Sequence, residues 1–450
     1  MPMFTIDKQT LSDLNAVSWN ASSLLNFFDN TITVGGRDVL YDYFLHPLND
    51  QEQIQHRQEA IAYLAKINID KLLDKYMMDD LERYLNLPQE LHSQSQFSHY
   101  LDKLSTNFWS LNYEKEQLLI KQSIGEIAQI LINIFTLFED ARCSGKPIGL
   151  LKALSDSFRE LSKDFDVEEL KEVSLGKNRL HTVIKYDYIF RNIKKSNIRE
   201  CFVIWYTVDA LRSVSKSFSK KLLVFPKFVT KGEGETLLNI KGFYNLALEN
   251  PIKNDVEVER YRNIWFLTGA NMTGKSTLLK SVGACIYLAH LGFPVPADSM
   301  QITLFRGLMT TINLGDNLAA GYSHFFSEVH RLKVIAEMLS EQRKMVIMLD
   351  ELFKGTNYQD AYEATLKLID SIAGIEDAVF FISSHIAELA IELEKNEKVV
   401  FKFLTTQMDE DKGVVFNYRL ASGVADKKLG MWFLEREKVF DTFKQVKSAK

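Results

Sequence analysis

The run Gly269–Thr277 contains the residues whose types and spacing point most clearly to a chemical role. It reads Gly-Ala-Asn-Met-Thr-Gly-Lys-Ser-Thr. Four residues separate its first glycine from Gly274-Lys275-Ser276, which is the spacing of a P-loop. In such a loop the backbone N–H groups point inward as donors to phosphate. We therefore expect Lys275 to neutralise the β- and γ-phosphates of a nucleotide and the Ser276 hydroxyl to bind Mg²⁺.

The residues on either side of the loop favour the same interpretation. The apolar run Ile264–Leu267 predicts a buried strand before it, and the stretch that begins at Thr277 predicts a helix after it. The positive end of that helix dipole would face the phosphates. An accidental match at a strand-to-helix turn is the alternative, and the motifs further along the chain argue against it.

A second apolar run, Val346–Leu349, ends in Asp350 and Glu351, 75 residues after Lys275. This pattern predicts a buried strand that delivers two carboxylates to its C-terminal edge, where ligands bind in open α/β sheets. Asp350 suits the Mg²⁺ shell, and Glu351 is placed to polarise an attacking water. Taken alone, the pair is equally well explained by a strand that ends in two acidic residues by chance.

The run Ala378–Ile382 predicts another buried strand, and Ser383-Ser384-His385 follow it. A histidine at this edge can contact a γ-phosphate. A lone histidine is usually structural, but the interval after the acidic strand favours a functional role for His385.

Between the loop and the acids, Ser323 predicts the N-cap of an amphipathic helix that ends near Arg343. A helix N-terminus is an anion site. Because the P-loop already serves the phosphates of its own subunit, Ser323 would act on the nucleotide of a second subunit, which predicts a dimer. A plain capped helix is the alternative.

The elements that must position these residues fall into two predicted domains. Residues 1–235 show helical spacing of Leu, Ile, Lys, Glu and Gln, and predict a mostly helical core. After Gly232-Glu233-Gly234, short apolar runs alternate with helical segments, so residues 236–450 predict an α/β domain with a mixed, largely parallel sheet. Within the first domain, His181–Phe190 alternates loosely and predicts a short hairpin strand.

Composition limits the class of protein. The chain has 450 residues, is 46% hydrophobic and 25% charged, and carries a net charge of −5, so it can bury a large core but shows no global nucleic-acid signal. Its three widely spaced cysteines fit a reducing compartment. The first residues do not read as a signal peptide, and we interpret Ile127–Phe138 as a core helix rather than a membrane span. We expect a cytoplasmic protein.

One stretch of the chain is basic. From Lys177 to Lys231 there are 13 Lys or Arg against three acids, with Lys194, Lys195 and Arg199 close together. The stretch is either a surface that contacts a phosphate backbone or a solvated helix face.

Taken together, the motifs resemble those of the MutS family of ABC-class ATPases. The matching segments of the second half are Thr268–Thr277, Gly321–Glu328, Asp350–Thr356 with Asp360, Ser384–Leu389 and Leu420–Gly430. Looser matches to the family's helical core are Thr33–Arg37, His46–Leu48, Arg57, Asp209–Leu211 and Pro226. Three residues depart from the family pattern: Ala270 stands for its proline, Thr273 for its second glycine and His324 for a threonine.

The resemblance implies a dimeric, Mg²⁺-dependent ATPase that binds mismatched or branched DNA and belongs to DNA mismatch repair. The residues implied to bind ATP are Gly269, Ala270, Asn271, Met272, Thr273, Gly274, Lys275, Ser276 and Thr277, with Ser323 acting in trans. The implied catalytic residues are Lys275, Glu351 as the water-orienting base and His385 as the sensor of the γ-phosphate. The implied Mg²⁺ ligands are Ser276 and Asp350.

The resemblance does not include the family's mismatch reader. Mismatch-recognising members carry an N-terminal domain with a Phe-x-Glu motif, and this sequence begins directly at the core. We therefore expect a protein that engages DNA without itself reading a mispair. The alternative is an ABC-type ATPase that acts on structured RNA, the ribosome or a protein partner. A transporter subunit, a chromosome-maintenance ATPase and a small-molecule kinase fit the motif order and domain sizes less well.

Overall fold

The computed structural model describes residues 4–67, 69, 78–87, 111–143, 149–176, 180–220, 222–229, 236–312, 324–386, 388–409, 413–425 and 434–448. Contacts divide the chain into two packing units that interleave along the sequence. The sheet unit contains Met1–Phe27, Phe44–Ile54 and Phe218–Lys450, and the helical unit contains Phe28–Tyr43 and Gln55–Ser217. The predicted domains 1–235 and 236–450 divide the sequence rather than the packing, and they stay a prediction.

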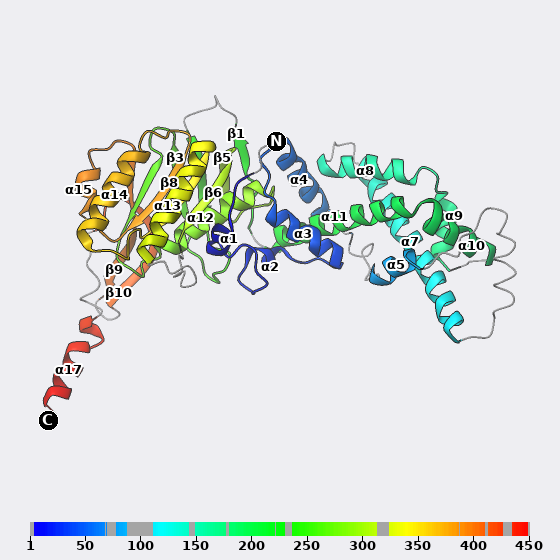
Figure 1. Ribbon diagram of the computed structural model, residues 1–450, viewed down its shortest axis with the longest axis horizontal. Helices are drawn as coiled ribbons and strands as arrows, with labels where there is room; N and C mark the ends of the chain where they lie inside the picture. The colour runs from blue at the N-terminus through cyan, green and yellow to red at the C-terminus, as the bar shows by residue number, and fades with distance from the viewer. Residues whose placement is uncertain are drawn as a thin grey trace. The chain divides into compact units, whose positions relative to one another are not determined.

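The helical unit is built from helices alone in its described part (Figure 1). They are α3 (Val34–Leu45), α4 (Gln51–Leu64), α5 (Met78–Leu85), α7 (Leu111–Cys143), α8 (Gly149–Ser162), α9 (Val167–Ser174), α10 (Leu180–Tyr188), the π-helix η2 (Ile189–Ile193) and α11 (Lys195–Lys220). The last residues of α3, the first residues of α4 and the last residues of α11 belong to the sheet unit. The long helix α7 packs against α5, α9 and α10, so it forms the centre of this unit.

Helix α7 also meets a simple test for a membrane span. By length and composition alone, Leu118–Glu139 is apolar enough to cross a membrane, and 44% of that window is buried inside the protein. Core helices of soluble proteins meet the same test. The buried residues Ile127, Leu131 and Ile134 recur at helical spacing, which is the pattern of a helix that packs along one face.

The prediction of a hairpin strand at His181–Phe190 is wrong, because this segment is helix α10 running into η2. Its described buried positions are Val183, Tyr186, Asp187 and Phe190, and these intervals of three, one and three follow the helical period rather than a period of two. The β-branched and aromatic content of the segment suggested a strand. A buried ion pair between Asp187 and Arg191, four residues apart, joins α10 to η2.

A buried aspartate, Asp209, connects α11 to the start of α3 in the helical unit. Its carboxylate accepts hydrogen bonds from the backbone N–H of Thr33 at 2.8 Å and from the Thr33 hydroxyl at 2.8 Å, immediately before α3. Gly36, in the first turn of α3, leaves the necessary space, since a Cβ there would lie 2.4 Å from an Asp209 carboxylate oxygen. Two of the sequence segments that resemble the family's core therefore meet in space.

The sheet unit contains two sheets. The six-stranded sheet has the order β10-β9-β4-β8-β7-β6, in which only the β10–β9 pair is antiparallel. Its strands are β4 (Ile264–Thr268), β6 (Gly307–Thr311), β7 (Met345–Asp350), β8 (Val379–Ser384), β9 (Val399–Asp409) and β10 (Gly413–Ser422). The α/β class and the mixed, largely parallel sheet are thus present in this unit.

The four-stranded sheet was not predicted from the sequence. Its order is β1-β5-β2-β3, and it contains β1 (Lys227–Val229), β2 (Thr236–Phe243), β3 (Asn254–Glu259) and β5 (Ser299–Thr303). The remaining described helices of the unit are α1 (Lys8–Asp13), α2 (Leu24–Phe28), α12 (Lys275–His290), α13 (His324–Glu341), α14 (Tyr358–Ile372), α15 (Leu389–Leu393) and α17 (Val439–Ser448).

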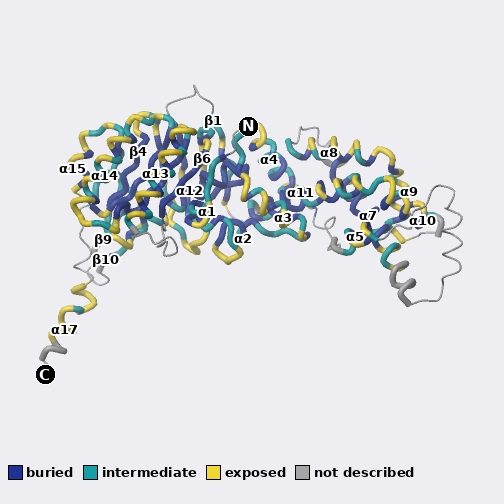
Figure 2. Tube along the Cα trace, in the orientation of Figure 1, coloured by how far each residue is buried: buried dark blue, intermediate teal, exposed yellow. Residues whose placement is uncertain are grey.

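Helix α12, which follows the P-loop, is buried along almost its whole length. It contacts β2 of the four-stranded sheet and β6, β7 and β8 of the six-stranded sheet. Helices α13 and α14 pack with β7 and β8 in a large apolar core that includes Ile335, Ile369 and Phe380. Figure 2 shows the central strands of this unit as buried segments, so the strand before the P-loop and the helix after it both lie in the core.

Candidate nucleotide-binding site

The P-loop connects the end of β4 to the start of α12, as predicted from the flanking residues. Gly269 has a φ of 139° and Gly274 a φ of 99°, in the region that favours glycine. A Cβ at Gly274 would also lie 3.1 Å from the ring of Tyr418. No side chain caps the N-terminus of α12 among the described residues, which leaves its backbone N–H groups to an anion.

Lys275 lies inside this loop and is only 3% exposed. Its Nζ donates to the backbone oxygens of Gly269 at 2.7 Å and Ala270 at 3.0 Å. The same nitrogen lies 3.2 Å from Oε1 of Glu351. The lysine is thus turned into the loop cradle, where the chemistry of its ammonium group suits a triphosphate.

Ser276 and Asp350 meet although they are 74 positions apart, since the Ser276 hydroxyl donates to an Asp350 oxygen at 2.5 Å. Ser383 donates a hydrogen bond to the other oxygen of Asp350. A hydroxyl and a carboxylate are oxygen donors of the kind that Mg²⁺ uses beside phosphates. The described residues hold no group of three or more His, Cys, Asp or Glu side chains suited to a metal ion. A Mg²⁺ ion here would complete its shell with phosphate and water oxygens.

Glu351 follows directly at the end of β7 and is 7% exposed. Its backbone N–H is 3.1 Å from both the hydroxyl and the carbonyl oxygen of Ser383, and Lys354 Nζ lies 2.6 Å from its Oε2. Burial raises the pKa of the Glu351 carboxyl, but the hydrogen bond from Lys354 and the charge of Lys275 outweigh it, so the pKa lies below its ordinary value. Glu351 is therefore a charged hydrogen-bond acceptor.

Comparison with known proteins adds independent information. Residues 265–441 match the family model of MutS domain V. The chain is 24% identical to the DNA mismatch repair protein MutS of Thermotoga petrophila, over 95% of this chain and 62% of that protein. It is 23% identical to the Clostridioides difficile protein of the same name, over 98% of this chain and 55% of that protein.

These matches support a MutS-family protein. A relative from Fusobacterium nucleatum, also described as DNA mismatch repair protein MutS, is 32% identical over 50% of this chain and 25% of its own length. The chain thus spans at most 62% of the length of these three relatives.

Four of the predicted residues, Lys275, Ser276, Asp350 and Glu351, lie together at the C-terminal ends of the strands of the six-stranded sheet. The strands β4, β7 and β8 are neighbours in register, with Thr268 opposite Ser384 and Asp350 opposite Ser383. His385 follows β8 by one residue and is exposed, so its role as a phosphate sensor stays a prediction. Ser323 lies outside the described residues, and its action on a second subunit stays a prediction as well.

Two further residues lie at the site, and the sequence alone assigned a role to neither of them. Lys354 was noted only as part of a motif, yet it binds Glu351. Tyr418 faces Gly274 with its ring, and a φ of 52° places its backbone in the left-handed region. Asn254 holds that conformation, because its side chain donates to the Tyr418 carbonyl at 2.9 Å and accepts from Leu420 N at 2.7 Å. Only the fold brings these residues together.

Several basic residues of the stretch Lys177–Lys231 pair with acids of the helical unit. Lys194 contacts Asp164, Lys185 contacts Glu169, and Arg199 lies 3.0 Å from Glu82. These pairs favour the interpretation of a solvated helix face over that of a surface dedicated to phosphate.

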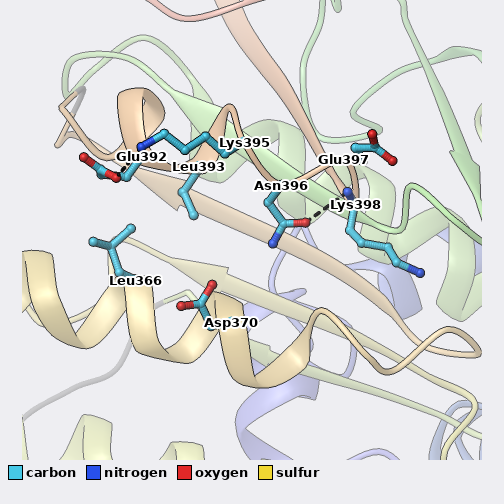
Figure 3. A pocket seen from close by; sticks show the side chains of 8 residues that line it. All are labelled: Leu366, Asp370, Glu392, Leu393, Lys395, Asn396, Glu397 and Lys398. Atoms are coloured by element: carbon cyan, nitrogen blue, oxygen red, sulfur yellow. Dashed lines mark hydrogen bonds and ion pairs between the residues drawn. The ribbon is translucent and has the colours of Figure 1, made fainter.

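A separate pocket of about 550 Å³ lies between α14 and the segment from α15 to β9 (Figure 3). It contains none of the predicted site residues and is lined by Leu366, Asp370, Glu392, Leu393, Lys395, Asn396, Glu397 and Lys398. Two of its lysines pair with acids, Lys395 with Glu392 and Lys398 with Glu376. This pocket is therefore separate from the candidate nucleotide-binding site.

Proposed function

We propose that this chain is a Mg²⁺-dependent ATPase that converts ATP and water to ADP and phosphate. The observation that carries the proposal is the convergence of Lys275, Ser276, Asp350 and Glu351 within direct contact at one sheet edge. A cation, a hydroxyl and two carboxylates in this arrangement are the parts that phosphoryl transfer to water requires.

Each side chain has a role that follows from its contacts. Lys275, with the free N–H groups of α12, would bind the phosphates in place of the loop carbonyls that it now contacts. Ser276 and Asp350 would hold Mg²⁺, which supplies charge stabilisation when bound. Glu351, charged and buried, would accept a hydrogen bond from the attacking water and orient it toward the γ-phosphorus.

Two substitutions test this function, because one should affect turnover and the other should affect ATP binding. Glu351→Gln removes the charged acceptor but keeps the shape of the side chain, so we expect retained ATP binding and a loss of turnover of about 100-fold or more. Lys275→Ala removes a phosphate contact and is expected to weaken binding itself. Steady-state ATPase assays and titration with a fluorescent ATP analogue separate the two. Wild-type turnover in Glu351→Gln would assign the water-orienting role elsewhere.

We further propose that the ATPase works as a homodimer whose nucleotide state controls its grip on DNA, mismatched or branched, in DNA repair. The similarity to proteins described as DNA mismatch repair protein MutS supports this proposal. The acids that match the basic stretch favour keeping a second candidate, an ABC-type ATPase that acts on structured RNA, the ribosome or a protein partner.

A further inference from the structure

The first described residues of the chain extend the six-stranded sheet. Thr5 forms a parallel bridge with Gly307 of β6, the edge strand. Its N–H donates to the Arg306 carbonyl at 2.8 Å, and its own carbonyl accepts from Leu308 N at 3.0 Å. We call Thr5, Asp7, Thr10 and Asp13 the N-terminal brace.

Two side chains of the brace bind the far end of β6. Asp13 is 1% exposed and accepts from the Thr310 hydroxyl at 2.6 Å and from Ile312 N at 2.9 Å. Thr10 is fully buried and accepts from Thr310 N at 3.0 Å. These bonds satisfy backbone and hydroxyl groups that an edge strand would otherwise leave unpaired.

The brace also binds helix α13 through Arg331. Both carboxylate oxygens of Asp7 contact the guanidinium, one of them 3.2 Å from Nη2. The same nitrogen donates to the Thr310 carbonyl at 2.8 Å, and Arg331 is 9% exposed. A bidentate pair of this kind, with a buried guanidinium and a half-buried carboxylate, fixes orientation as well as distance. One short helix therefore ties α13 to β6.

Helix α13 in turn packs against the residues that follow Glu351. We call Leu352–Gly355 the catalytic turn. The rings of Phe325, in the first turn of α13, and Phe353 have centroids 6.1 Å apart. A Cβ at Gly355 would lie 2.7 Å from Phe325 N, so the backbones of the helix and the turn are in close contact. The placement of α13 thus sets the surface on which the turn rests.

The catalytic turn needs such support because the backbone is strained both at Glu351, just before it, and within it. Glu351 has a φ of 48° and Phe353 a φ of 63°, and neither residue is glycine. Side chains larger than glycine stay in this region only where their surroundings hold them. A shift of α13 would relax the turn and move the Glu351 carboxylate.

We propose that the N-terminal brace positions Glu351, acting through Arg331, α13 and the catalytic turn. The role of Glu351 in this proposal rests on the proposed ATPase function. The support that the brace gives to the catalytic turn concerns only contacts within the nucleotide-free protein. Asp7 and Arg331 are positioning residues rather than catalytic ones, since neither contacts Glu351.

The test uses Asp7→Ala, Arg331→Ala and the double variant in the full chain. Lys333→Ala is the matched control, because Lys333 forms an exposed pair with Glu337 on the same helix. The first measurement is amide hydrogen exchange without nucleotide. We expect faster exchange in peptides that cover 350–357 for both single variants and unchanged exchange for Lys333→Ala.

The second measurement determines kcat and KM for ATP separately. We expect kcat to fall about tenfold while KM for ATP changes by less than about twofold, because a small displacement of a reacting group affects chemistry more than binding. The double variant should be no worse than Arg331→Ala alone, since removal of the arginine already breaks its connection to Asp7. Arg331→Lys should restore part of kcat.

The proposal is overturned if the brace peptides exchange faster while 350–357 is unchanged, or if KM rises and kcat stays constant. Should Arg331→Ala fail to fold, Asp7→Asn, which keeps the size of the side chain, decides the question by the same measurements. A wild-type protein without ATPase activity would refute the proposed function, whereas the exchange experiment would still decide whether the brace supports the turn.

Discussion

At Glu351, burial and positive charge act on the carboxyl group in opposite directions. Burial raises its pKa, and the hydrogen bond from Lys354 with the charge of Lys275 lowers it further than burial raises it. Because the folded pKa lies below the ordinary value, the ionised form stabilises the fold above that ordinary value. This contribution is lost as the pH falls through the folded pKa.

Lys354→Met should therefore raise the pKa of Glu351 and move the acidic limb of the kcat/KM profile to higher pH. Methionine keeps a similar length and removes the donor. Lys395→Met is the matched control, because Lys395 forms an equally spaced pair with Glu392 away from the site. ATPase assays from about pH 5 to about pH 8 measure the shift. An acidic limb identical to that of the control would show that Lys354 does not tune Glu351.

At the scale of elements, glycines inside helices have two distinct effects in the helical unit. Gly36 lies where a Cβ would meet the Asp209 carboxylate at 2.4 Å, whereas Gly125 in α7 has its nearest neighbour, a backbone oxygen, at 3.8 Å. The first glycine permits the Asp209 contact with α3, and the second merely weakens a helix.

Gly36→Ala should destabilise the protein by about 1–3 kcal/mol through overpacking, and Gly125→Ala should stabilise it by up to about 1 kcal/mol through helix propensity. Denaturant unfolding followed by far-UV circular dichroism compares the two with the wild type. Equal stability of both variants would show that the Asp209 carboxylate can move aside without cost.

The elements also show which parts of the structure the sequence could predict. The P-loop and the carboxylates at Asp350 and Glu351 follow from short-range patterns, because each motif lies within one strand and its turn. The contacts of Asp209 with Thr33, of Asp13 with Ile312 and of Tyr418 with Gly274 join residues far apart in sequence. No local pattern contains such a pairing, and residues 181–190 show that a local pattern can also suggest the wrong period.

At the scale of the whole molecule, the two candidate functions differ in the partner on which the proposed ATPase acts. Similarity to MutS proteins supports DNA as the partner. Lys194 and Arg199, however, already pair with acids, so they are not free to contact a phosphate backbone. Nucleotide-dependent engagement would require that ATP binds two states of the protein with different affinity.

We expect binding to DNA to depend on a non-hydrolysable ATP analogue, and a dimer to form with it. A titration at one stated salt concentration would compare duplex, mismatched, branched and single-stranded DNA with structured RNA. Light scattering would measure the mass of the assembly. Equal affinity with and without the analogue for every DNA would favour the second candidate function, and a monomer under all conditions would refute the dimer.

The brace has a consequence for the order in which the protein can be made. Asp13 leaves the ribosome 299 residues before Ile312, its hydrogen-bond partner, which is about 15–60 s at ordinary rates of translation. During that interval the residues of the helical unit, all of which lie between the two partners in sequence, can fold first. The sheet unit can only close when its last strands arrive, so its first helix is among the first segments synthesised and among the last to find its place.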